Sequence, residues 1–473
     1  MILSKRFFLP LILCTAAFAA KAQSGYNIKV KFTGLKDTVA YLGNYYGDKQ
    51  YLQDTSRIDK NGLVVFSGKE KLPGGLYLVV TPRKTYFEIV VDKEQNFSLE
   101  TDTADFIGSM KIKGSMDNEL FYEYLRNGVT MQKQLMDLNK SLADKKTKAD
   151  STAVFDQSKA INKQLEDYRS NFATKHPNTL LAKLFNAIPE PTIPEAPVLP
   201  NGRKDSTFAY RFYRAHFLDN VDLDDDRLLR TPIYHQKLNK YFTQVIPQIP
   251  DTISMEAVKI TERAKSNPET FKYAVWWLTY HYETSKIMGM DAVFVHMVEK
   301  YYMTNQVTWV DSAQRVKIIQ RAKDLAPTML GNKAPALPLR DMYLNKVSTD
   351  EIKNPYVVMI FWDPTCGHCK KEIPKLDSLY KKSLKAMGVE VIAINLEGDQ
   401  KQWMDYVKEH ELEWINLWDP YNESKFREKY DIKSTPVVFV LDKERKIRAK
   451  RISVEQVGEV LPKFMEMDKK SSP

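Results

Sequence analysis

The sequence predicts a multidomain protein with an N-terminal antiparallel β-sandwich, a middle all-α domain and a C-terminal α/β domain. Three observations lead to this fold class. The chain has 473 residues, which is long for a single hydrophobic core. Its hydrophobic pattern changes from short strand-like runs to helical spacing near residue 116, and to a buried-strand pattern after residue 326. Two of its three cysteines, Cys366 and Cys369, form a CxxC pair in that last part.

Residues 1–22 have the layout of a secretory signal peptide. Two basic residues precede an apolar run that is too short to span a bilayer, and small residues follow it. We therefore expect a mature protein that starts at Gln23, is exported to the periplasm and has no transmembrane helix. A lipoprotein signal is the alternative, since Cys14 could be lipidated, but Leu13 stands where a small residue is expected.

The charge pattern argues against a nucleic-acid-binding protein. The formal net charge is +10, from 70 basic and 60 acidic residues, and the two signs are interleaved along nearly the whole chain. Proteins that bind nucleic acids more often gather their basic residues in one patch. We expect a solvated surface and no nucleic-acid partner.

Residues 23–115 are predicted to form the β-sandwich. Short runs rich in β-branched and aromatic residues alternate there with glycine, asparagine and aspartate. The strand-like runs are 26–35, 38–47, 62–68, 74–81, 85–92, 96–101 and 110–114. No cluster of histidine, cysteine or paired carboxylates stands out among them, so the expected role is that of a folding or docking module.

Residues 116–326 are predicted to be helical, because apolar residues recur three and four positions apart. A proline-rich connector at 189–200 interrupts the pattern, since proline lacks the amide donor that a helix needs. The helical stretches are 119–146 and 151–176, which resemble a helical hairpin, followed by 206–218, 232–246, 269–288, 291–303 and 311–325.

The C-terminal part, residues 327–473, holds the predicted chemistry. The run "PYVVMIFWDP" is typical of a strand buried in a sheet, and helical spacing starts at "CGHCKKEIPKL". Cys366 thus falls where a strand passes into a helix, and the free amides and dipole of a helix N-terminus stabilise a thiolate. Cys369 follows one turn later and can resolve a mixed disulfide. The ring of His368 can also stabilise the thiolate, which would make the oxidised form a stronger oxidant.

This part resembles the TlpA/ResA group of exported thioredoxin-fold thiol:disulfide oxidoreductases. "FWDPTCGHCKKEIP" is similar to the active-site strand and helix of that group, and "STPVVFVLDKERKI" to its cis-proline strand and hairpin. The resemblance implies a cis peptide bond before Pro436 and a substrate-facing backbone at Thr435. It also implies a proton-transfer role for Glu372, and an extra central strand and helix at 389–419.

Other features of the motif qualify this resemblance. Trp362 and Gly367 complete the set of residues that we expect to contact a substrate. Ile360 stands where thioredoxin has a buried acid, and Thr365 replaces the usual tryptophan before the first cysteine. The whole chain is also similar to exported Bacteroidetes proteins that join a β-domain and a helical domain of unknown function to this module.

Metal and haem sites fit the CxxC pair poorly. A structural zinc site needs four ligands, and a c-type haem site needs CxxCH, whereas residue 370 is lysine. In the helical part, His296 and Glu299 lack the HExxH arrangement of a helix-borne metal site. We therefore expect no metal and no cofactor, although a copper carrier that uses the two thiolates stays open.

The function predicted from the sequence is a thiol:disulfide oxidoreductase that acts on protein disulfides. By the resemblance it is a reductase that receives electrons from a membrane donor. The Gly-His dipeptide is the one found in protein disulfide isomerase, so a disulfide oxidase or isomerase is the alternative. A non-enzymatic protein that binds a partner or a glycan is an alternative of another class. The sequence does not predict an oligomeric state.

Overall fold

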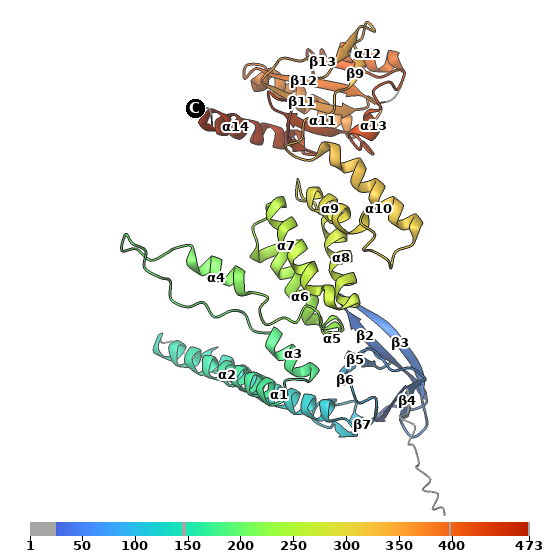
Figure 1. Cartoon of the computed structure of the whole chain (residues 1–473), viewed down its shortest axis with the longest axis vertical. Coiled ribbons are helices and arrows are strands. Elements are labelled where there is room, and N and C mark those ends of the chain that lie inside the picture. Colours follow the sequence, from blue (N-terminus) through green and yellow to red (C-terminus); the bar gives the residue numbers. More distant parts are fainter. Residues whose placement is uncertain (1–24, 144–147, 397–398, 472–473) are drawn as a thin grey trace, which may run out of the picture. The chain divides into compact units, whose positions relative to one another are not determined.

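The computed structural model describes residues 25–143, 148–396 and 399–471 (Figure 1). The predicted signal peptide, with Cys14, lies outside the described residues. Two β-sheets, a helical region and a third β-sheet follow one another along the chain, so the predicted fold class is confirmed. The chain divides into two compact units, with the division after Lys240. Among the described residues, no helix is both long and apolar enough to cross a membrane.

The N-terminal sandwich consists of two four-stranded sheets with the strand orders β4-β1-β7-β8 and β3-β2-β5-β6. Phe32 of one sheet packs against Phe87 of the other, with 6.1 Å between ring centroids. Strands β1 and β7 are parallel, so the first sheet is mixed, whereas the prediction had only antiparallel pairs. The strands are β1 (Tyr26–Thr33), β2 (Thr38–Tyr46), β3 (Lys49–Ile58), β4 (Leu63–Gly68), β5 (Gly75–Val80), β6 (Tyr86–Val91), β7 (Asn96–Asp102) and β8 (Lys111–Lys113).

Strand β3 has no counterpart among the predicted strands. Only Ile58 of its ten residues is buried, because β3 lies at the edge of its sheet and pairs with β2 alone. An edge strand with most side chains in water does not need the alternation of apolar and polar residues that identifies a half-buried strand. The hairpin before it turns at Gly47, whose φ of 62° lies in the left-handed region that glycine adopts most easily.

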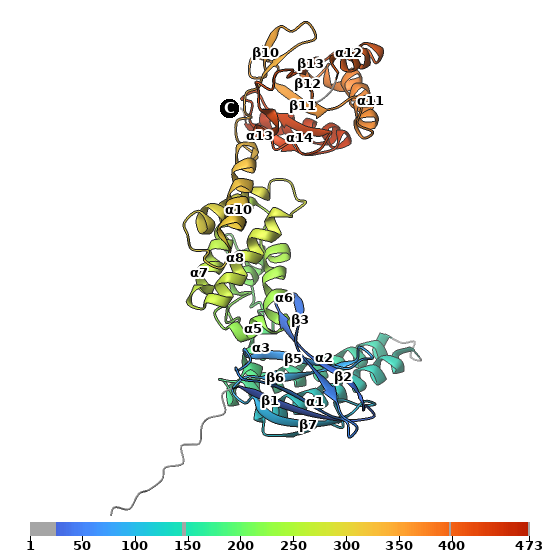
Figure 2. The ribbon, with the colours of Figure 1, turned by 90° about the vertical axis from the view of Figure 1, so that its right-hand side faces the viewer.

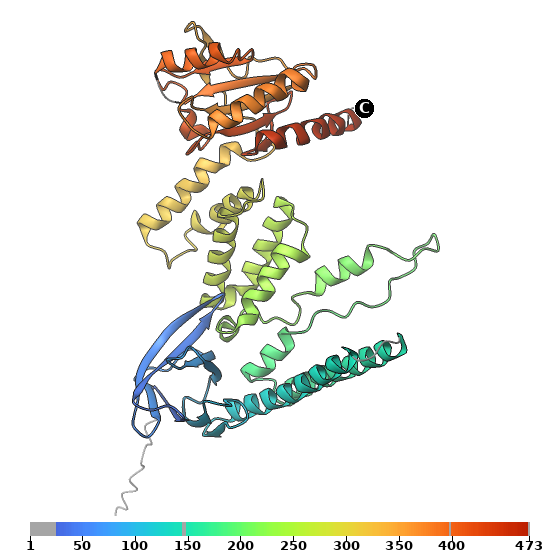
Figure 3. The same cartoon turned by 180° about the vertical axis from the view of Figure 1, so that it is seen from behind.

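Helices fill the rest of the first unit. The predicted hairpin is formed by α1 (Met116–Ala143) and α2 (Lys148–Lys175), which run side by side in Figures 1 and 3. Arg169 of α2 donates a hydrogen bond of 2.7 Å to the Tyr124 hydroxyl of α1. The proline-rich segment after them contains no helix. The remaining helices are α3 (Leu180–Ala187), α4 (Phe208–His216), α5 (Asp226–Leu229) and α6 (Pro232–Lys240).

The second unit begins with a group of helices. These are η1 (Tyr241–Val245), α7 (Pro250–Arg263), η2 (Ala264–Ser266), α8 (Pro268–Glu283), α9 (Asp291–Met297), η3 (Val298–Tyr302), α10 (Ser312–Leu325) and η4 (Ala326–Thr328). The last of the long helices, α10, begins at an aspartate cap: the Asp311 side chain accepts a hydrogen bond from the backbone amide of Gln314.

The C-terminal sheet has the strand order β10-β9-β13-β12-β11-β14-β15. Strands β11, β12 and β13 are parallel, and β14 runs antiparallel to β11, as in a thioredoxin fold. The predicted extra strand and helix are present as β12 and α12. The elements are β9 (Pro338–Arg340), β10 (Lys346–Ser348), β11 (Tyr356–Trp362), α11 (Cys369–Leu379), η5 (Tyr380–Leu384), β12 (Val389–Asn395), α12 (Gln400–Glu409), β13 (Ile415–Trp418), α13 (Phe426–Lys429), β14 (Val437–Leu441), β15 (Ile447–Lys450) and α14 (Val454–Ser471).

Strand β11 is buried on both faces, which explains its continuous apolar sequence. Ile360 and Trp362 point into a core that α11, α12 and α14 complete. Met359 and Phe361 point into a second core on the other face, which α13 covers. Figure 2 shows α11 and α12 beside the strands. The sheet thus holds the end of β11, and the cysteines that follow it, in a fixed place.

We expect Phe361→Ala to destabilise the C-terminal domain by about 3–5 kcal/mol, because it removes a fully buried ring and leaves a cavity. That ring lies 6.0 Å from Phe426, 5.0 Å from Tyr430 and 6.0 Å from Phe439, measured between centroids. Urea denaturation followed by tryptophan fluorescence measures the change. The control is Tyr343→Ala, whose side chain is 79% exposed and which we expect to shift stability by no more than about 0.5 kcal/mol. Equal effects of the two substitutions would contradict this account of the core.

Candidate active site

The two cysteines lie at the junction between β11 and α11. Helix α11 begins at Cys369, and the backbone amide of Lys370 donates a hydrogen bond of 3.0 Å to the carbonyl of Cys366. Both thiols are free in the structure, Cys366 partly exposed and Cys369 buried. The prediction that Cys366 lies where the strand passes into the helix therefore agrees with the structure.

The sulfur of Cys366 lies against the loop that precedes β14. Its thiol donates a hydrogen bond of 3.6 Å to the backbone carbonyl of Thr435. The Thr435 side chain, as the largest cause, and the backbone amides of Cys369 and His368 hold the pKa of the Cys366 thiol below its usual value, although partial burial opposes them. The carbonyl of Thr435 favours the protonated thiol, whereas its side chain and the two amides favour the thiolate, so the lowered pKa depends on where the Thr435 side chain lies.

Cys369 has the opposite environment. Its side chain is fully buried in the core that Ile360 and Trp362 also line. Burial raises the pKa of this thiol to about 11, because a thiolate loses its hydration there. The site thus pairs one accessible sulfur that favours the thiolate with one enclosed sulfur that stays protonated at neutral pH.

The peptide bond between Thr435 and Pro436 is cis, as the resemblance implies. Both residues are partly exposed, and the carbonyl of Thr435 lies next to the Cys366 sulfur. Gly367 and His368 are exposed as well, and a side chain at position 367 would meet no atom within 4 Å. These four residues form an accessible surface around Cys366, and their contact with a substrate stays a prediction.

The structure corrects the prediction for Trp362. Its side chain is fully buried, because its position on β11 points into the core beneath α11 and α12. A substrate bound at Cys366 cannot touch it there. Trp362 instead packs against Tyr406 of α12, with 5.2 Å between ring centroids. It supports the site from within the domain.

Glu372 forms an ion pair on the surface of α11. Lys375 lies 2.8 Å from the Glu372 carboxylate and 2.6 Å from the carboxylate of Glu455 at the start of α14. Through Lys375, Glu372 thus takes part in a surface contact that joins two helices. A proton-transfer role for Glu372 stays a prediction.

Two neighbours of the site were not predicted from the sequence. Tyr406 lies near Cys369: burial, and then the charge of a Cys369 thiolate, raise the pKa of its hydroxyl. The helical spacing of Trp403, Tyr406 and Val407 could have placed it on the inner face of α12. Asp431, four residues before Thr435, is buried among basic side chains, and its local sequence carries no signal of this.

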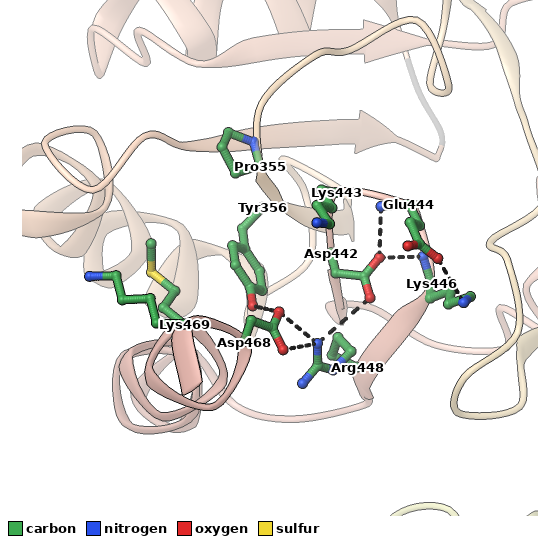
Figure 4. A pocket seen from close by; sticks show the side chains of 10 residues that line it. Pro355, Tyr356, Asp442, Lys443, Glu444, Lys446, Arg448, Asp468 and Lys469 are labelled. Atoms are coloured by element: carbon green, nitrogen blue, oxygen red, sulfur yellow. Dashed lines mark hydrogen bonds and ion pairs between the residues drawn. The ribbon is translucent and has the colours of Figure 1, made fainter. Parts of the chain in front are cut away.

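A cavity of about 420 Å³ lies at the other end of β11, away from the cysteines (Figure 4). Tyr356, the first residue of the strand, donates a hydrogen bond to Asp468 there. Arg448 lies 2.9 Å from Asp468 and 3.6 Å from Asp442. These groups satisfy one another, and they lie at the start of β11, whereas the cysteines follow its end.

Family models match three parts of the chain. Residues 330–450 match the AhpC/TSA family, and residues 26–121 and 131–326 match two domains of unknown function, DUF4369 and DUF5106. A thiol-disulfide oxidoreductase ResA from Bacillus cereus is 29% identical over 143 residues, which are 30% of this chain and 80% of the relative. The ResA of Bacillus subtilis (strain 168) is 26% identical over 117 residues, which are 25% of this chain and 64% of the relative.

Solved structures of related proteins include a domain of a possible thiol-disulfide isomerase from Cytophaga hutchinsonii ATCC 33406. It is 36% identical, covers 31% of this chain and 99% of its own, and has a TM-score of 0.29. A thioredoxin-like protein from Bacteroides caccae ATCC 43185 is 20% identical, covers 56% of this chain and 96% of its own, and has a TM-score of 0.44.

We expect the two thiols of the reduced protein to be alkylated in a fixed order. Between about pH 6 and 9, iodoacetamide should label Cys366 and leave Cys369 unlabelled, because the thiolate is the reactive form. Thr435→Val should raise the pKa of Cys366 and slow its labelling at pH 6 by a factor of about ten for each pKa unit. Peptide mapping by mass spectrometry gives both rates.

The matched control is Thr365→Val. Thr365 stands next to Cys366 in the sequence, but its hydroxyl donates to Asp363, at 2.8 Å. Labelling of Cys366 should therefore keep its pH profile in this variant. Preferential labelling of Cys369 in the wild-type protein would contradict the assignment of the two environments.

Proposed function

We propose that the protein is an exported reductase of protein disulfides, because residues 330–450 match the AhpC/TSA family and a thiol-disulfide oxidoreductase ResA is 29% identical over 143 residues. In this proposal Cys366 is the attacking thiol and Cys369 is the resolving thiol. The β-sandwich and the helical domain accompany the redox domain through export to the periplasm, and a membrane protein supplies the electrons.

The difference between the two thiols carries the proposal. Cys366 is accessible, and its thiolate is stabilised by the Thr435 side chain and two backbone amides. Cys369 is enclosed and stays a thiol until a mixed disulfide has formed on Cys366. A dithiol mechanism uses this difference, because the accessible sulfur attacks the substrate and the enclosed sulfur attacks the mixed disulfide afterwards.

The reaction proceeds in two exchanges. The Cys366 thiolate attacks one sulfur of a substrate disulfide, the substrate S–S bond breaks, and the departing sulfur takes up a proton. The mixed disulfide then lies beside the Thr435–Pro436 loop. Cys369 gives up its proton and attacks the Cys366 sulfur, which releases the second substrate sulfur as a thiol. The substrate gains two electrons and two protons, and the protein keeps a Cys366–Cys369 disulfide that the membrane donor reduces.

A disulfide oxidase or isomerase is the second candidate, and one observation favours it. The hydrogen bonds to Cys366 stabilise the thiolate of the reduced protein. A stabilised reduced form makes the disulfide a stronger oxidant, which is the property of oxidases such as DsbA. The reductase is favoured by what the resemblance to the TlpA/ResA group implies, since the matched proteins themselves are named only thiol-disulfide oxidoreductases.

We expect Cys369→Ser to accumulate a mixed disulfide with a protein substrate, and Cys366→Ser to lose turnover. The first variant can attack but cannot resolve, and the second lacks the attacking sulfur. Reduction of insulin disulfides measures turnover, and non-reducing gel electrophoresis detects the mixed disulfide. An active Cys366→Ser protein would refute the assignment of the attacking thiol.

The reduction potential of the Cys366–Cys369 pair distinguishes the two directions. A reductase with a membrane donor should have a potential near or below about −270 mV, as thioredoxin has. A potential near or above about −180 mV would instead identify an oxidase or isomerase. Equilibration of the full chain in glutathione buffers, followed by thiol alkylation and mass spectrometry, gives the value. Failure to form the disulfide would remove both candidates.

A further inference from the structure

Asp431 forms a buried ionic junction directly before the loop that carries Thr435. Its side chain is 2% exposed, and one oxygen lies 2.5 Å from the Arg451 guanidinium. The other oxygen lies 2.7 Å from Arg321, and Lys433 is 3.3 Å away. Burial opposes the ionisation of Asp431, but Arg321 and Arg451 together lower its pKa. The carboxylate is therefore charged and held between the two arginines.

The junction joins two different parts of the chain within the second unit. Arg321 belongs to α10, inside the stretch that matches DUF5106, whereas Asp431 lies inside the stretch that matches AhpC/TSA. Other contacts tie the same parts together. Lys450, at the end of β15 and 5% exposed, forms an ion pair with Asp291 of α9, and its backbone amide donates to the sulfur of Met288.

The loop from residue 432 to residue 436 has no helix or strand, so contacts at and near its ends determine where it lies. Ile432 is one of these contacts: its side chain is buried, and its amide donates a hydrogen bond of 3.1 Å to the carbonyl of Arg427. At one end, Val437 is paired with Phe361 of β11. At the other end, Asp431 has a φ of 50°, in the left-handed region, and is held by its arginines. Between these ends Thr435 presents its carbonyl and side chain to Cys366.

We propose that Arg321 of the helical domain is a positioning residue for the redox site, which it orders by fixing Asp431 and thereby the Thr435 loop. The helices that share the second unit with the redox site are then a part of the machinery that sets the reactivity of Cys366. This inference rests on the proposed thiol chemistry of Cys366. It assigns a role to part of the stretch that matches DUF5106, a domain of unknown function.

The test uses the full chain with Arg321→Gln, which keeps most of the side chain but removes its charge. A looser Thr435 loop stabilises the Cys366 thiolate less, so the reduced form loses stability relative to the disulfide. We expect the equilibrium with glutathione to shift about threefold to tenfold towards the disulfide, which corresponds to a potential about 14–30 mV more negative. Arg321→Lys should keep most of the wild-type potential, because the charge stays near Asp431.

The matched control is Arg315→Gln on the same helix. Arg315 donates a hydrogen bond of 2.8 Å to Asn305, within the helical domain, and should leave the potential unchanged. Asp431→Asn removes the acidic partner of Arg321 and should shift the potential in the same direction. The double variant Arg321→Gln with Asp431→Asn should shift it no further than Asp431→Asn alone, since both substitutions break one junction.

An Arg321→Gln potential equal to that of wild type, or additive shifts in the double variant, would overturn the proposal. Circular dichroism and urea denaturation of each variant show whether it is folded. If Arg321→Gln is unfolded, the other two variants test the proposal: Arg321→Lys should keep most of the wild-type potential, and Asp431→Asn should shift it. Failure of the proposed function is distinguishable, because it appears as a wild-type chain without a Cys366–Cys369 disulfide or as an active Cys366→Ser variant.

Discussion

The contact between the Cys366 sulfur and Thr435 is the interaction on which the site depends. It joins two segments that are 69 residues apart in the sequence. The Thr435 carbonyl accepts a hydrogen bond from the Cys366 thiol, and the Thr435 side chain is the largest cause that lowers the pKa of that thiol. Strand β11 places the cysteine from one side, and β14 begins directly after the loop that places the threonine. Since β11 and β14 are paired neighbours, the sheet brings both ends of this contact together.

The same contact depends on a helix from outside the redox domain, α10. Asp431 directly precedes the loop. Its carboxylate is neutralised by Arg451, the residue after β15, and by Arg321 of α10. Buried carboxylates need such partners, because an uncompensated charge in a protein interior is strongly unfavourable. A helix of the middle domain therefore completes the environment of a loop in the redox domain.

The sequence was most informative where local pattern and burial agree. The apolar run of β11 and the CxxC pair after it predicted the strand, the helix and the place of Cys366, because every residue of that strand is buried. The Thr-Pro step predicted the cis peptide bond at Pro436 through its resemblance to a known family. Strand β3 was missed, because an edge strand in water carries no alternation of polar and apolar side chains.

The substrate contact of Trp362 was misplaced for a related reason: strand alternation decides which side a residue faces, and proximity to Cys366 in the sequence does not. Arg321 and Asp431 were out of reach, since they are 110 positions apart and each looks like an ordinary charged residue in its own segment. Ion pairs between distant segments leave no periodic trace in a single sequence.

The burial of Cys369 also determines how the site meets oxidative damage. Of the two cysteines that the structure describes, a peroxide can reach the thiolate of Cys366 and convert it to a sulfenic acid. The neighbouring thiol, shielded from the same reagent, can condense with that sulfenic acid and expel water. The product is the disulfide of the normal cycle, which the electron donor can reduce. Disulfide formation therefore protects Cys366 from further oxidation to the irreversible sulfinic acid.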